Sequence, residues 1–137
     1  MNPDESANSP PYFAFSASLR ILGDIADWGA ISRALNLQPT ETHRRGECGR
    51  LNKPLAHDAW IYEAQVPEES AATDHVLALC HALEAAQDLA SLRERHRVEV
   101  FCGYRSDSDY GYFELSTQAL SALASLGLPI HFSVIVT

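Results

Sequence analysis

Hydrophobic and polar residues alternate along much of this chain in the two-residue period of β-strands. Five segments have this pattern or a short apolar run: residues 12–21, 59–66, 98–104, 110–115 and 130–136. A short polar stretch joins the third segment to the fourth, so we expect a hairpin with a bulge at Gly103. The last segment ends in a continuous apolar run, which predicts a central strand.

Between the strands, apolar residues recur at helical spacing. Asp24 can begin a short helix that ends at Asn36 and Pro39, and a long helix is expected over about residues 71–95. Ser116 is a suitable cap for a third helix, which Gly127 would end. The segment between residues 40 and 54 is expected to be a loop or a short strand.

This order of elements predicts an α+β fold. We expect a two-layer sandwich, with three helices packed on one face of a mainly antiparallel sheet, and a ferredoxin-like arrangement is one way to connect them. A chain of 137 residues is long enough for one hydrophobic core. Residues 12–137 are therefore expected to form a single domain, after a disordered lead at residues 1–11 that is rich in proline and polar residues.

Composition narrows the classes of partner. The formal net charge of −8 disfavours nucleic acid and anionic membranes and favours basic partners. No apolar segment is long enough for a membrane span, and the start of the chain lacks the pattern of a secretory signal. Three widely spaced cysteines indicate reduced thiols and a cytoplasmic location. The glycines are scattered rather than grouped in a phosphate-binding loop, so no nucleotide cofactor is expected.

The basic loop, which we define as residues 43–53, is the leading candidate site, because residues 42–53 hold four of the ten Lys and Arg residues of an acidic chain. Arginine pairs well with carboxylate or phosphate. The expected ligand-binding residues, including aromatic residues that could form a wall, are His43, Arg44, Arg45, Arg50, Trp60 and Tyr104. The alternative is a solvated loop whose cations pair with Glu41, Glu47 and Asp58.

Other kinds of site have weaker support. His43, Cys48 and His57 are possible zinc ligands, but their spacing matches no known zinc motif, so we predict no metal. His75 and His81 lie about 120° apart around the long helix and are expected at or near the surface. No nucleophile motif appears, and we predict no catalytic residue.

Several segments together resemble one bacterial family, catalogued as domain of unknown function 4279. They are an aromatic-rich first strand, Trp60 at the start of a later strand, and LNLQPT (35–40), HRRGE (43–47), YRSDS (104–108), GYFELS (111–116) and LASLGL (123–128). The resemblance spans about residues 12–136 and implies a small bacterial α+β domain. It implies no known reaction or ligand.

We therefore predict a non-enzymatic binding or interaction module, for example an immunity-type protein that captures a basic partner. The alternative is a small-molecule binding protein or enzyme that holds an anionic ligand at the basic loop. An exposed edge strand could also pair two copies into a homodimer.

Overall fold

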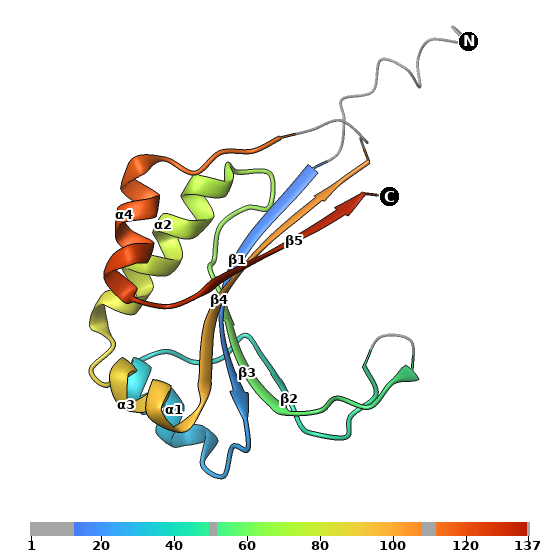
Figure 1. The fold of residues 1–137 in the computed structure, drawn as a ribbon, viewed down its shortest axis with the longest axis vertical. Helices are drawn as coiled ribbons and strands as arrows, with labels where there is room; N and C mark the ends of the chain where they lie inside the picture. The colour runs from blue at the N-terminus through green and yellow to red at the C-terminus, as the bar shows by residue number, and fades with distance from the viewer. Residues whose placement is uncertain (1–12, 50–51, 108–111, 137) are drawn as a thin grey trace, which may run out of the picture.

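The computed structural model describes residues 13–49, 52–107 and 112–136, and the statements below concern these residues. The expected disordered lead at residues 1–11 lies outside them. The described strands form one five-stranded sheet in the order β2-β3-β1-β4-β5 (Figure 1). The strands are β1 (Phe13–Gly23), β2 (Glu41–His43), β3 (Asp58–Glu63), β4 (Arg97–Ser106) and β5 (Ile130–Val136). β4 and β5 are parallel and every other pair is antiparallel, so the sheet is mixed.

All the described helices lie on one side of this sheet (Figure 1). They are α1 (Trp28–Leu35), α2 (Ala72–Ala82), α3 (Leu89–Arg95) and α4 (Thr117–Leu126), with a short 3-10 turn, η2 (Leu83–Ala85), after α2. The predicted α+β class is confirmed, and none of the described helices lies on the opposite side of the sheet. We call that side the open face.

The alternation of β1 explains the two faces. Phe15, Ala17, Leu19 and Ile21 point toward the helices and are at most 9% exposed. Their neighbours across the sheet continue the core, for example Trp60 on β3, which is fully buried. The intervening residues of β1, with serine and arginine among them, therefore point to the open face.

The ends of two helices follow from their sequence. Asp27, rather than the predicted Asp24, begins α1, because its carboxylate accepts a 3.0 Å hydrogen bond from the backbone amide of Ala30. Ser116 accepts a 3.1 Å bond from the Ala119 amide at the start of α4, as predicted. Gly127 ends α4 with φ 66°, a left-handed conformation that favours glycine.

The predicted long helix over residues 71–95 is wrong: it divides into α2, η2 and α3. Leu83 and Leu92 are both buried, at 3% and 2% exposed. In one straight helix, residues nine apart would point in roughly opposite directions. The chain leaves helical geometry at Ala86, and the Gln87 amide donates a 3.0 Å bond to the Ala34 carbonyl of α1. The described residues thus contain four α-helices instead of three.

The predicted hairpin is also wrong, because β1 and β5 already occupy both edges of β4. Residues 112–115 form no strand and instead cover the aromatic end of the core. There Phe113 packs 5.6 Å from Phe15, 5.4 Å from Tyr104 and 6.1 Å from Phe132, measured between ring centroids.

Two further expectations about the strands fail. β5 is an edge strand, and its side chains on the helix side, Phe132, Val134 and Val136, are 50%, 58% and 52% exposed. The pairing of β4 runs through Gly103 without interruption, so there is no bulge there. A ferredoxin-like arrangement is not confirmed by the observed strand order.

Candidate functional site

The open face carries a hollow of about 1360 Å³ that extends across β1, β3, β4 and β5. Its middle is a row of small residues that lie opposite one another on adjacent strands: Ser16 on β1, Gly103 on β4 and Ser133 on β5. Because Gly103 has no side chain, the Ser16 hydroxyl occupies the space above it. A Cβ atom at Gly103 would lie only 2.7 Å from that oxygen.

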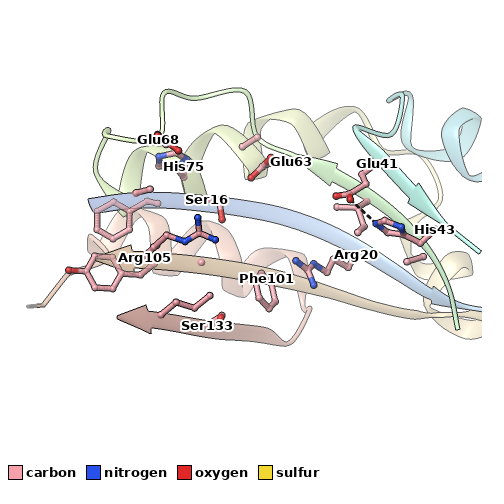
Figure 2. Close-up of a pocket in the computed structure, with 18 of the residues that line it drawn as sticks. Ser16, Arg20, Glu41, His43, Glu63, Glu68, His75, Phe101, Arg105 and Ser133 are labelled. Atoms are coloured by element: carbon pink, nitrogen blue, oxygen red, sulfur yellow. Dashed lines mark hydrogen bonds and ion pairs between the residues drawn. The ribbon is translucent and has the colours of Figure 1, made fainter. Parts of the chain in front are cut away.

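Two arginines border this row on opposite sides. Arg105 on β4 follows Gly103 by two residues on the same face, and Figure 2 shows its side chain extending toward Ser16. No hydrogen bond or ion pair joins Arg105 to any other described residue. Arg20 on β1 lies on the other side, with its guanidinium carbon 3.7 Å from the centroid of the Phe101 ring.

The carboxylates of the open face are at its margins and several are already paired. Glu99 is 7% exposed and forms contacts of 3.0 Å with Arg97 and 2.9 Å with His131. Glu41 contacts His43 at 2.7 Å. Glu63, at the end of β3, is exposed and lines the hollow. The centre of the hollow therefore combines hydroxyls and guanidinium groups, which suit an anion.

The basic loop has a different arrangement from the one expected. Arg44 lies against Trp28, with its guanidinium carbon 5.4 Å from the ring centroid. Arg45 is 4.0 Å from Asp24 and its side chain is 70% exposed. Arg50 lies outside the described residues. The described arginines of this loop thus point to the helix α1 end and to solvent, and they do not converge on the hollow.

Among the described residues of the basic loop, Cys48, Gly49 and His43 line the hollow. His43 reaches the open face because it belongs to β2. Partial burial lowers its pKa, but hydrogen bonds and charge from Glu41 and Glu47 outweigh this effect, so the pKa lies above its ordinary value. The imidazole is 2.7 Å from Glu41 and 3.3 Å from Glu47. These contacts occupy both ring nitrogens.

Asp58 holds the basic loop to the rest of the fold. Its carboxylate accepts backbone hydrogen bonds from Arg45 at 2.7 Å and from Ile25 at 2.9 Å. The bond from Arg45, followed by that from Ile25, holds the pKa of Asp58 below its ordinary value.

The two aromatic residues expected at the site lie on the helix side of the sheet. Trp60 is fully buried there and its indole donates a 3.2 Å hydrogen bond to Ser32. Tyr104 stacks on Phe15 with 4.9 Å between ring centroids and is also among the residues lining the hollow. The structure therefore brings His43 and Tyr104 to the hollow but not Arg44, Arg45 or Trp60.

No group of three His, Cys, Asp or Glu side chains suited to a metal ion occurs among the residues that the structure describes. The thiol of Cys48 is exposed and contacts the Asn52 side chain at 3.6 Å. Burial raises the pKa of the Cys80 and Cys102 thiols, so both are weak nucleophiles. Within the same described part of the chain, no helix is long and apolar enough to cross a membrane.

Comparison with known proteins identifies a family whose match begins at the first residue of β1. The family model described as Domain of unknown function (DUF4279) matches residues 13–137. The chain belongs to this family. The resemblance recognised in the sequence is thereby confirmed. No curated protein and no solved structure has detectable similarity to the chain.

The most distinctive residues of this DUF4279 domain were missed in the sequence. Ser16, Arg20 and Phe101 fell within expected strands and Arg105 within the polar stretch expected to join two strands, so none of them was singled out as a site residue. A signal was present, since on each strand an arginine follows a small residue by two positions and so shares its face: Ser18 precedes Arg20 and Gly103 precedes Arg105. The third small residue, Ser133, could be aligned with them only after the pairing of β5 was known.

Proposed function

We propose that this protein is a non-enzymatic binding module that holds an organic anion on the open face of its sheet. The anion is a carboxylate or phosphate attached to an apolar body. Its charged group would lie over Ser16 and Gly103 beside Arg105, and its apolar part would lie along Phe101. This proposal keeps the anionic ligand predicted from the sequence but moves it from the basic loop to the open face.

The observation that carries the proposal is the Arg105 guanidinium, which extends over the row of small residues without a partner among the described residues. Arginine prefers planar, bidentate pairing with carboxylate or phosphate. The neighbouring hydroxyl of Ser16 can donate a further hydrogen bond to the same anion.

Calorimetric titration with phenyl phosphate tests this function, with benzoate and inorganic phosphate as further probes. We expect phenyl phosphate to bind most tightly, because it combines the anion with an aromatic body. Arg105→Ala should weaken it about tenfold or more, since a charge-assisted hydrogen bond contributes about 1.5–3 kcal/mol.

The matched control is Arg95→Ala, which removes the same charge from α3, where the side chain contacts Ser91 at 3.2 Å. This variant should bind like the wild type. Failure of all three anions to bind, or equal losses in both variants, would overturn the proposal.

Capture of a basic protein remains a second proposal, supported by 18 acidic against 10 basic residues. It predicts salt-dependent binding of a lysine-rich peptide that Arg105→Ala leaves unchanged or strengthens. The bacterial origin and cytoplasmic location expected from the sequence belong to both proposals.

We also propose that β5 pairs two copies of this chain. β5 is an edge strand of seven residues with no Asp, Glu, Lys, Arg or Pro, and it exposes Phe132, Val134 and Val136. The other edge, β2, has three residues and includes Glu41 and His43. Natural edge strands are usually protected by charge, proline or shortness, as β2 is. Because β5 lacks carboxylates, two copies can meet there despite their net negative charge.

A further inference from the structure

The segment after β3 leaves an opening beside β1. Ala64 donates a 2.9 Å backbone bond to Ala17, and Glu68 accepts a 2.8 Å bond from Phe15. Between these two bonds the segment does not pair with β1, because the Val66 amide bonds back to Ala64 and Pro67 has no amide hydrogen. The residues on both sides of this opening line the hollow.

His75 on α2 lies behind the opening. Figure 2 shows its ring between β1 and the segment that carries Glu63 and Glu68. The residue is 1% exposed and is among those lining the hollow. Both ring nitrogens are buried, and neither has a hydrogen-bond partner among the residues that the structure describes.

An imidazole at this position is unusual for packing alone. His75 occurs in the buried row of α2 with Ala72, Val76 and Leu79, where an apolar side chain would satisfy the core. The sequence prediction of a surface or half-buried histidine is therefore wrong. A buried donor and acceptor without partners destabilise the fold, so such groups are usually paired with protein, water or ligand.

We propose that His75 is the polar group of a second, inner subsite that takes a hydroxyl carried on an apolar body. A hydroxyl can donate to a ring nitrogen that carries no proton or accept from one that does. Phe15 supplies an aromatic wall, with its ring centroid 6.4 Å from that of His75. The inference rests on the proposed function in one respect, since the subsite opens into the hollow that would hold the anion.

The test uses phenol, which has the hydroxyl and the apolar body but no anion. On 15N-labelled protein, phenol should shift the ring-nitrogen resonances of His75. His75→Phe should weaken phenol binding by about tenfold, the effect of removing one buried hydrogen bond. His75→Gln keeps a donor and an acceptor and should lose less than about threefold.

Phenyl phosphate then distinguishes binding at the inner subsite from binding in the hollow. Its binding should depend on Arg105 and be unchanged in His75→Gln. If phenol shifts the ring-nitrogen resonances of His75 but phenyl phosphate does not bind, the proposed function is wrong and the inner subsite is supported. If phenyl phosphate binds but the ring-nitrogen resonances of His75 do not shift up to the solubility limit of phenol, the proposed inner subsite is wrong. A crystal structure in which phenol leaves ordered water on both ring nitrogens would contradict it equally, even if His75→Phe does not fold.

Discussion

The guanidinium carbon of Arg20 lies 3.7 Å from the centre of the Phe101 ring, across the boundary between β1 and β4. The two residues are diagonal neighbours, since Ser18 is opposite Phe101 and Arg20 is opposite Glu99. The Arg20 Nε atom is also 3.5 Å from the Ser18 hydroxyl. These contacts hold a flat cation on an aromatic ring beside the row of small residues.

Replacing the ring tests this relationship. Phe101→Leu should lower the free energy of unfolding by about 1 kcal/mol, because the cation–π contact is lost. It should also weaken phenyl phosphate binding, since the aromatic floor and the orientation of Arg20 are both removed. Urea unfolding and calorimetry measure the two effects. Phe132→Leu, on the other side of the sheet, is the control, and equal binding by Phe101→Leu and wild type would contradict the role of the ring.

A larger side chain in the middle of the hollow should abolish phenyl phosphate binding while leaving both arginines in the sequence. At Gly103 a new Cβ would meet the Ser16 hydroxyl at 2.7 Å, a contact that requires Ser16 to move. Gly103→Val should therefore remove phenyl phosphate binding. The double variant Ser16→Ala, Gly103→Ala should have a higher melting temperature than Gly103→Ala alone, because the close contact is relieved. The double variant should still bind phenyl phosphate more weakly than wild type, because it lacks the Ser16 hydroxyl. Melting temperatures and titrations of these variants check both statements, and undiminished binding by Gly103→Val would place the ligand elsewhere.

Acid should release the basic loop from Asp58. Because the folded-state pKa of Asp58 is lowered, its carboxylate contributes stability above the unfolded value near 3.8, and this contribution is lost as the pH falls through the folded pKa. Asp58→Asn should therefore melt below wild type at neutral pH, and the difference should narrow in acid. Melting curves against pH measure it. Asp24→Asn, at a side chain that is 90% exposed, is the matched control. A difference in melting temperature between Asp58→Asn and wild type that stays constant with pH would contradict this assignment.

A lysine on the edge strand should separate the proposed dimer. Val134 is 58% exposed on β5, and a charge there would meet its own copy across a two-fold axis. Light scattering should find a dimer for the wild type and a monomer for Val134→Lys. Leu120→Lys, at a 52% exposed position of α4, should remain dimeric. A wild type that is monomeric at high concentration would refute pairing through β5.

The sequence predicted elements well where local chemistry decides and poorly where pairing decides. The serine cap at Ser116 and the left-handed Gly127 are local, and both were correct. The apolar run of β5 suggested a central strand because a buried strand and a hydrophobic edge have the same composition. The break between α2 and α3 depends on where Leu83 and Leu92 meet the core, which no local pattern specifies.

The candidate site was also hard to predict, because its residues come together only through strand pairing. Charge density along the chain singled out Arg44 and Arg45, which are neighbours in sequence but point away from the hollow. Arg20 and Arg105 are distant in sequence and lie on one face of the sheet, on either side of the same hollow, only because β1 and β4 pair in this register. His75 was hidden for another reason, since a histidine in a helical row of apolar residues looks like a tolerated substitution.

The central claim is that the open face, rather than the basic loop, holds the anion. Titration of 15N-labelled protein with phenyl phosphate, followed by backbone amide shifts, tests it most directly. The account predicts saturable shifts at Ser16, Gly103 and Ser133, with little change at Arg44 and Arg45. Shifts centred on Arg44 and Arg45, or no saturable shift at any of these amides, would contradict it.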